Sequence, residues 1–214
     1  MESIRFFTDD GISLEGDLRV DREPPLGTAV LFHPHSRHGG SKDHPLLWAI
    51  RNDLASRGFA ALAFNFRGVM GSGGAYGGGH DELRDARAAV SRVRVESPKT
   101  PTFVCGWSFG AVVALREALE DPRVGGLALV GLPLRPPKDV DLPALPDPAE
   151  LGSFGRPVLL LAGGADELCP AEELATFGAT RSASVTIVEG ADHYFEHREK
   201  EAATAVGDFA ERLL

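Results

Sequence analysis

Hydrophobic and polar positions follow two different periods along the chain. On either side of Asp10-Gly11, apolar and polar residues alternate, which predicts an antiparallel hairpin formed by residues 4–8 and 12–20. After residue 27, short runs that are apolar throughout alternate with segments whose apolar residues recur at helical spacing. The runs are typical of strands buried on both faces, and the spaced segments are typical of helices with one buried face.

These patterns give an alternating order of strands and helices. Strands are predicted at 28–33, 59–64, 102–105, 127–130, 158–162 and 185–188. Helices are predicted from Pro45 to just before Gly58, and at 83–93, 109–119, 171–177 and 202–213. Because strands that alternate with helices form parallel sheets covered on both sides, we expect an α/β fold. It would have about eight strands in a mostly parallel sheet, with the hairpin as an antiparallel edge.

The segment 132–148 interrupts this alternation. It is rich in proline and charge, and it is long for a connection between two strands. The sequence is equally consistent with a small lid and with a plain surface loop. No large cap domain, internal repeat or domain boundary is visible, so we expect one domain over residues 1–214.

Composition and charge narrow the class of protein. The chain has 214 residues, of which 43% are hydrophobic, enough for one well-packed core. Its net charge of −9 argues against a nucleic-acid or anionic-membrane partner. No apolar segment approaches the roughly 18 residues that span a bilayer, and residues 1–10 carry no secretory signal. Cys105 and Cys169 are expected as free thiols in a reducing compartment, so we expect a cytoplasmic protein.

The pentapeptide GWSFG at 106–110 lies between a predicted strand and a predicted helix. A G-x-S-x-G sequence in this position is typical of a sharp turn that lifts the serine hydroxyl above the end of the strand. Glycine is needed on both sides because larger residues would clash in the tight backbone. The helix that follows directs its positive N-terminal dipole at the same point. The pattern therefore predicts Ser108 as a nucleophile.

A serine hydroxyl is a poor nucleophile without a base and an orienting acid. Asp166 follows the predicted strand at 158–162, and His193 follows the one at 185–188. The order Ser, Asp, His is the order that a nucleophile turn of this kind requires. We therefore predict a catalytic triad of Ser108, His193 and Asp166.

Three residues near Asp166 and His193 in the sequence are considered as alternatives to these two members of the triad. Glu167 is the rival acid, although Asp166 stands nearer the end of the strand. Asp192 is expected to cap or brace the loop that carries His193. His197 is the rival base, and we expect it in the exposed first turn of the last helix.

Several stretches of the chain together resemble a known family. They are 33–36 (HPHS), 64–68 (FNFRG) with Gly71-Ser72, 106–110 (GWSFG), 164–166 (GAD) and 190–193 (GADH). Over essentially its full length the chain is similar to the α/β-hydrolase superfamily, and within it to short bacterial hydrolases that resemble dienelactone hydrolases and small carboxylesterases. The resemblance implies an eight-stranded sheet and the triad named above. Dienelactone hydrolases proper carry a cysteine as nucleophile, where this chain has Ser108.

A tetrahedral intermediate needs two main-chain N–H groups aimed at its oxygen. Phe109, directly after the nucleophile, is predicted to supply one. By the resemblance, the loop after the strand at 28–33 supplies the other, near His35. Pro34 has no N–H, so His35 or Ser36 remains, and we take His35 as the second donor of the oxyanion hole.

Four histidines crowd one stretch of the sequence. They are His33, His35, His38 and His44. Imidazole is a common metal ligand, but Asp43 is the only acid nearby, so we predict no metal site here. His33 is more simply explained as a residue that fixes the loop at the end of a strand.

Residues 71–79 are rich in glycine, yet they contain no lysine and are too long for a phosphate-binding loop. We predict a flexible loop that rims the site, and no cofactor. Arg67 is expected to brace neighbouring loops through hydrogen bonds.

The sequence thus predicts a serine hydrolase that cleaves a small carboxylic ester or thioester through an acyl-enzyme. Without a large cap, we expect an open site for short acyl groups. The alternatives are a serine peptidase for small peptides and a non-catalytic binding protein that keeps the fold. The expected partner is the small-molecule ester itself, and the protein would be a monomer or a small homo-oligomer.

Overall fold

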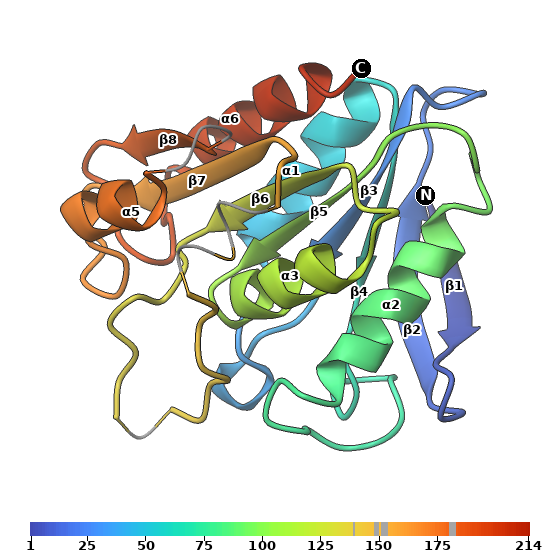
Figure 1. Cartoon of the computed structure of the whole chain (residues 1–214). Helices are drawn as coiled ribbons and strands as arrows, with labels where there is room; N and C mark the ends of the chain where they lie inside the picture. Colours follow the sequence, from blue (N-terminus) through green and yellow to red (C-terminus); the bar gives the residue numbers. More distant parts are fainter. Residues whose placement is uncertain (139, 148–149, 151–153, 180–182) are drawn as a thin grey trace.

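The chain folds around a central sheet (Figure 1). The computed structural model describes residues 1–138, 140–147, 150, 154–179 and 183–214, and these form eight strands in the order β1-β2-β4-β3-β5-β6-β7-β8. The strands are β1 (Glu2–Phe7), β2 (Ser13–Arg19), β3 (Gly27–Phe32), β4 (Phe59–Phe64), β5 (Thr102–Trp107), β6 (Gly126–Val130), β7 (Val158–Gly163) and β8 (Ala183–Val188).

The direction of the strands confirms the predicted architecture. The hairpin strand β2 is antiparallel to both of its neighbours, β1 and β4. From β4 through β3 to β8, every neighbouring pair is parallel. The structure is therefore a mostly parallel eight-stranded sheet with an antiparallel N-terminal hairpin at one edge, as the patterning indicates.

Helices cover both faces of the sheet. They are α1 (Pro45–Ser56), α2 (Glu82–Val93), α3 (Phe109–Glu120), α5 (Ala171–Phe177) and α6 (Glu199–Glu211). One core layer joins the sheet to α2, α3 and α5, and the other joins it to α1 and α6. Successive strand residues point to opposite faces, so Val30 and Phe32 pack in the first layer while Ala29 and Leu31 pack in the second.

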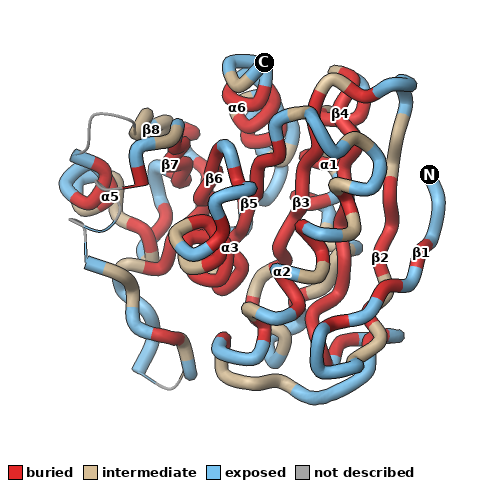
Figure 2. The backbone as a smooth tube through the Cα atoms, turned by 45° about the vertical axis from the view of Figure 1, so that its right-hand side comes forward, coloured by how far each residue is buried: buried red, intermediate tan, exposed pale blue. Residues whose placement is uncertain are grey.

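The central strands are buried along their whole length, as Figure 2 shows for β3, β5 and β6. This burial explains why their sequences are apolar without alternation. The edge strand β1 instead alternates between buried and exposed residues. Within the described part of the chain, no helix combines the length and the apolar character needed to cross a bilayer.

The observed β5 is longer than the strand predicted at 102–105. Gly106 and Trp107 continue it, although glycine is a poor strand former. Gly106 pairs with Phe32 of β3 on one side and Leu129 of β6 on the other, and Trp107 pairs with Val130. The ladder on both sides overrides the weak local preference and carries the strand directly to Ser108.

Of the segment 132–148, the structure describes 132–138 and 140–147, and positions 139 and 148 lie outside the described residues. The described part contains no helix or strand. Leu134, Leu142 and Leu145 are half-buried and pack against the core layer of α2 and α3. The segment is thus an irregular stretch held to the fold by apolar side chains.

Arg67 braces the loops at this end of the sheet, as predicted. Its Nε and Nη2 donate to Asp85 Oδ1 at 2.9 and 2.8 Å, and its main-chain N–H donates to Asp85 Oδ2 at 2.8 Å. Its Nη1 donates to Asp10 Oδ2 at 3.1 Å. Because Asp10 lies in the hairpin turn and Asp85 in α2, the guanidinium ties three parts of the chain together.

Glu117 on α3 is a fully buried acid. Burial raises the pKa of its carboxyl group to about 8, and the nearby negative charge of Asp121 acts in the same direction. Arg87 Nη2 lies 3.5 Å from Glu117 Oε2 and only partly offsets this effect. At neutral pH the side chain is therefore protonated in the folded protein, and its proton is available to the Asp121 carboxylate.

We predict that Glu117 makes the protein less stable as pH rises from about 5 to about 8. Folded Glu117 keeps its proton up to about pH 8, whereas the unfolded chain releases it near the ordinary pKa of a glutamate side chain, 4.5. The unfolded state then binds fewer protons, so the free energy of unfolding falls with pH, by at most about 1.4 kcal/mol per pH unit. Urea unfolding across this range should show that Glu117→Gln removes this contribution, so that its stability falls less steeply with pH than that of the wild type.

Glu201→Gln is the control, because Glu201 lies on α6 with its side chain 52% exposed and pairs with Arg198 rather than with the neighbours of Glu117. This variant should keep the pH dependence of the wild type. Parallel stability curves for Glu117→Gln and the wild type would show that Glu117 is ionised in the folded state.

Candidate active site

Ser108 occupies a sharp turn between β5 and α3. Its φ of 57° and ψ of −118° lie in a region that residues other than glycine rarely adopt. A Cβ on Gly106 would lie 2.0 Å from the Gly110 carbonyl oxygen, and a Cβ on Gly110 would lie 2.3 Å from the Phe32 carbonyl oxygen. Glycine is therefore required at both positions, and the turn brings the start of α3 against the end of β3.

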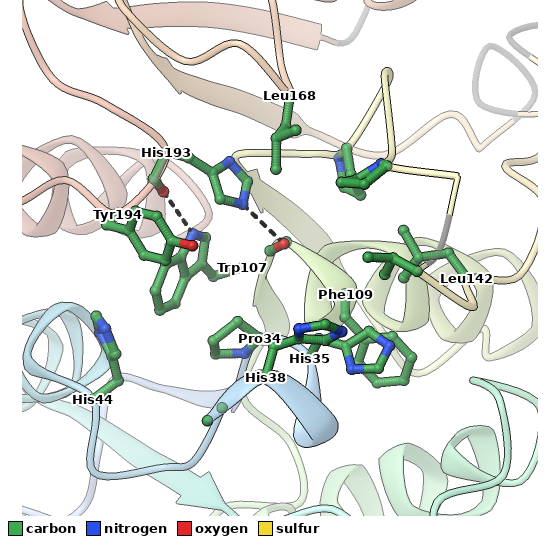
Figure 3. A pocket seen from close by; sticks show the side chains of 16 residues that line it. Pro34, His35, His38, His44, Trp107, Phe109, Leu142, Leu168, His193 and Tyr194 are labelled. Carbon is green, nitrogen blue, oxygen red and sulfur yellow. Dashed lines mark hydrogen bonds between the residues drawn. The ribbon is translucent and has the colours of Figure 1, made fainter.

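The predicted base lies next to the serine. His193, in the loop after β8, has its Nε2 2.9 Å from Ser108 Oγ (Figure 3). Its Nδ1 lies 2.9 Å from Asp166 Oδ2, in the loop after β7. With Nδ1 carrying the proton that faces Asp166, Nε2 is free to accept the hydroxyl proton of Ser108. The structure thus brings together the three residues that the sequence predicts as a triad.

The Asp166 carboxylate is held from its other side. The main-chain N–H groups of Leu168 and Cys169 donate to its Oδ1 at 2.9 and 3.0 Å. Asp166 is 4% exposed, so these bonds and the imidazole replace most of its contact with water. A carboxylate that accepts several N–H bonds is held in one orientation, which fixes the imidazole ring in turn.

A hydrogen bond that sequence reasoning missed positions the loop of His193. Trp107 Nε1–H donates to the main-chain oxygen of His193 at 3.1 Å (Figure 3). The indole ring also packs against His44, whose ring centroid is 4.4 Å away. Trp107 stands beside Ser108 in the pentapeptide, but its partner is 86 residues distant, so the sequence gives no sign of the contact.

The three rival residues, Glu167, Asp192 and His197, take no part in the hydrogen bonds that join Ser108, His193 and Asp166. The side chain of Glu167 is exposed. Asp192 braces its loop as expected, since its Oδ1 accepts from the main-chain N–H groups of Tyr194 and Glu196. The side chain of His197 is 91% exposed, and it lies before α6 rather than in its first turn, because the helix begins at Glu199.

The two residues predicted to form an oxyanion hole, Phe109 and His35, line the same cleft as Ser108. Phe109 is the first residue of α3, and His35 precedes a short 3₁₀ turn, η1 (Ser36–His38), in the loop after β3. Among the described residues, neither N–H donates a hydrogen bond to another group. The close approach of Gly110 to the Phe32 and His33 carbonyl oxygens brings this loop and the start of α3 together. Neither N–H group is thus occupied by another described group.

His33 fixes this loop, as the sequence suggests. It is fully buried, and burial lowers the pKa of its imidazole to about 4. Its Nδ1 lies 2.6 Å from the Pro34 carbonyl oxygen, and its Nε2 accepts from the main-chain N–H of Phe66 at 3.0 Å. The neutral ring therefore joins the loop after β3 to the loop after β4. No group of histidine, cysteine or acidic side chains suited to a metal occurs in the described part of the chain.

A cleft of about 200 Å³ opens above Ser108. Apolar and aromatic side chains dominate its walls, and the ionisable residues that line it are histidines and Tyr194. Its lining comprises Pro34, His35, His38, Gly39, Gly40, His44, Trp107, Ser108, Phe109, Pro133, Pro137, Val140, Leu142, Leu168, His193 and Tyr194. The described lining contains no Asp, Glu, Lys or Arg, which favours an uncharged ligand.

The glycine-rich stretch 71–79 contributes nothing to this described lining, so it does not rim the cleft as predicted. Hydrogen bonds to the first residue of α2 hold it in place instead. The main-chain N–H groups of Gly77 and Gly79 donate to the buried Glu82 carboxylate at 2.8 and 2.7 Å. Both cysteines are buried, and burial raises the pKa of each thiol to about 12, so neither is poised as a nucleophile.

The chain is similar to several known proteins. A family model described as an alpha/beta hydrolase domain matches residues 28–212. An uncharacterized protein of Rickettsia prowazekii is 26% identical over 204 residues, which cover 92% of this chain and 83% of the relative. A pimeloyl-[acyl-carrier protein] methyl ester esterase of Stenotrophomonas maltophilia is 28% identical over 117 residues, 55% of this chain and 45% of its own. A Xanthomonas campestris crystal structure, described as an α/β serine hydrolase without lid, matches with a TM-score of 0.81 and 24% identity over 100% of this chain and 94% of its own.

We predict that Gly106→Ala destabilises the protein by roughly 3 kcal/mol or more. The new Cβ would overlap the Gly110 carbonyl oxygen, and backbone on both sides must move. Gly125→Ala is the matched control at the other end of the sheet, where a Cβ would meet only the Thr102 oxygen at 3.5 Å. Urea unfolding should place the control near the wild type. Equal stability of the two variants would show that the turn has room for a side chain.

Proposed function

The chain belongs to the alpha/beta hydrolase domain family, and we propose that it is a serine hydrolase that cleaves small carboxylic esters or thioesters through an acyl-enzyme. The observation that carries the proposal is the chain of contacts at the floor of an apolar cleft. Ser108 Oγ lies 2.9 Å from His193 Nε2, and His193 Nδ1 lies 2.9 Å from Asp166 Oδ2. A serine, a base and an orienting acid in this order are the parts that acyl transfer requires.

In the first half of the reaction, Ser108 Oγ attacks the carbonyl carbon of the substrate. His193 Nε2 accepts the hydroxyl proton as the new C–O bond forms. The negative charge of Asp166 stabilises the imidazolium and keeps the ring oriented. The imidazolium then gives its proton to the leaving alcohol or thiol as the ester bond breaks, which leaves an acyl group on Ser108.

The negative charge that develops on the carbonyl oxygen is stabilised by the main-chain N–H groups of Phe109 and His35. Removal of one such donor costs roughly 3–4 kcal/mol of transition-state stabilisation in well-studied enzymes. The N-terminal end of α3 adds a favourable partial positive charge at the same point. In the second half, water attacks the acyl carbon while His193 Nε2 accepts its proton. The imidazolium then returns that proton to Ser108 Oγ as the bond between Oγ and the acyl carbon breaks, which releases the acid product.

The cleft supports a short, uncharged acyl group as the substrate. Its described lining is largely apolar and lacks charged carboxylate, ammonium and guanidinium groups, and its volume is about 200 Å³. A free peptide terminus would find no fixed opposite charge there, so the lining favours an ester or thioester over a small peptide. The partial likeness to a methyl ester esterase points in the same direction.

We predict that a fluorophosphonate probe labels the wild-type protein on Ser108. The phosphonate accepts attack by an activated serine and holds the product in a geometry that resembles the tetrahedral intermediate. Ser108→Ala should lose the label and should lower the hydrolysis of p-nitrophenyl acetate by at least about 10⁴-fold. Mass spectrometry of the labelled peptide identifies the site. An unlabelled wild type, or a Ser108→Ala variant that is labelled equally well, rules out the proposal.

We predict that Asp166→Ala and Glu167→Ala have very different effects, although the two acids are neighbours. Loss of Asp166 removes the partner of His193 Nδ1 and should lower kcat/KM roughly 10⁴-fold. Glu167 is exposed, so its loss should change kcat/KM by no more than about twofold. Steady-state kinetics on p-nitrophenyl acetate checks both. Similar losses in the two variants would mean that the acid has been assigned incorrectly.

A further inference from the structure

Three loops meet at one point behind the cleft. The Tyr76 hydroxyl lies 2.6 Å from the main-chain oxygen of Asp141 and 3.0 Å from His35 Nε2. His35 Nε2 itself lies 3.1 Å from the same Asp141 oxygen. Tyr76 comes from the glycine-rich stretch 71–79, His35 from the loop after β3, and Asp141 from the segment that follows β6. We call this group the Tyr76 clasp.

The hydrogen atoms of the clasp can be assigned from the contacts. His35 Nδ1 accepts from the main-chain N–H of Arg37 at 3.2 Å, so the ring carries its proton on Nε2. That proton is donated toward the Asp141 oxygen and the Tyr76 oxygen. The Tyr76 hydroxyl in turn donates to the Asp141 oxygen. The Asp141 carbonyl thus accepts two hydrogen bonds and is held firmly in one orientation.

Close packing adds to these bonds. Pro143 rests on Gly79, where a Cβ would lie 2.7 Å from Pro143 Cδ. On the outer side, Arg116 Nη2 donates to the main-chain oxygen of Ala144 at 2.7 Å. Residues 141–144 are therefore attached to both the glycine-rich stretch and α3.

The residues on either side of Asp141 form part of the cleft wall. Val140 and Leu142 both line the cleft, so the carbonyl that the clasp holds lies between two wall residues. Figure 3 shows Leu142, Phe109 and His35 around one end of the cleft, opposite His193 and Tyr194. In the proposed reaction His193 protonates the leaving group, which therefore lies on its side. The acyl chain then extends toward the end formed by Leu142, Phe109 and His35.

We propose that the Tyr76 clasp sets the length of acyl chain that the enzyme accepts, by holding Val140 and Leu142 as the end wall of the acyl site. Tyr76 is thus a specificity-determining residue that acts through Asp141, without contact to the substrate. This inference rests on the proposed function of the same site. It gives a role to the tyrosine in a stretch that is otherwise glycine, serine and alanine.

The test measures kcat/KM for p-nitrophenyl esters from acetyl to dodecanoyl. Tyr76→Phe keeps the ring and loses the hydroxyl. In this variant we expect the ratio of octanoyl to acetyl kcat/KM to rise about fivefold, which corresponds to the contribution of one neutral hydrogen bond. Acetyl hydrolysis should change less than about twofold, because the triad is untouched. Hydrogen exchange at residues 140–147, followed by mass spectrometry, should become faster. A chain-length profile identical to the wild type overturns the proposal.

Two substitutions at His35 test whether the hydrogen bonds of the Tyr76 clasp, rather than the tyrosine alone, determine the chain-length preference. His35 itself lines the cleft, so both variants change its wall, but only Gln retains a side-chain N–H near the position of Nε2. The ratio of octanoyl to acetyl hydrolysis should therefore be lower in His35→Gln than in His35→Leu. Equal ratios in these two variants would contradict the role of the hydrogen bond. Because the substitutions leave the main-chain N–H of His35 in place, they separate the clasp from the oxyanion hole.

Thr100→Val is the matched control for loss of a hydroxyl group. Thr100 Oγ1 donates to the Ser97 oxygen at 3.0 Å. Thr100 lies just before β5, at the amino-terminal end of the parallel strands, whereas the cleft lies at their carboxyl end. This variant should leave the chain-length profile unchanged, and a change equal to that of Tyr76→Phe would overturn the proposal. A wild type that hydrolyses none of the esters overturns the proposed function and this inference together. A wild type that is active while Tyr76→Phe keeps its profile overturns this inference alone.

Discussion

The tight backbone turn at residues 106–110 is the constraint on which the site depends. Two stretches of main chain approach so closely there that neither Gly106 nor Gly110 has room for a Cβ. The turn forces Ser108 into a backbone conformation that costs roughly 1–3 kcal/mol, and such strain persists only where the surroundings over-determine it. The ladders of β5 with β3 and β6 supply part of that restraint, since they hold the strand up to Trp107.

Trp107 and Phe109, on either side of Ser108 in the pentapeptide, supply the rest of the restraint on its backbone. Trp107 is buried in the core layer of α1 and α6, and Phe109 is buried in the opposite layer with α2 and α3. A large aromatic side chain therefore anchors the chain on each side of Ser108, in cores on opposite faces of the sheet. Rotation of the serine out of its strained conformation would pull one of these rings out of a packed layer, which costs several kcal/mol. The strain is thus offset by the burial of two aromatic side chains.

The three residues at the floor of the cleft could be predicted from the sequence because each lies in a recognisable local pattern. Ser108, Asp166 and His193 each follow an apolar run, and parallel strands end at the same edge of a sheet. Strand order is then enough to bring their loops together. The sequence was less informative about Trp107 and Tyr76. The hydrogen bonds of these residues connect positions 86 and 65 apart in the chain, and neither residue lies in a motif that specifies its partner.

This difference separates residues that follow local sequence patterns from residues that act through long-range contacts. The floor depends on glycines, strand ends and one histidine loop, which any member of the fold can retain while its connecting segments change. The wall depends on a contact among three such segments, and one of them, after β6, has no regular structure in its described part. A hydrolase of this architecture can therefore change its substrate without altering its nucleophile. Under the proposed function, reaction type and acyl specificity are then encoded in different parts of the sequence, the first in short local patterns and the second in contacts such as the one between Tyr76 and Asp141.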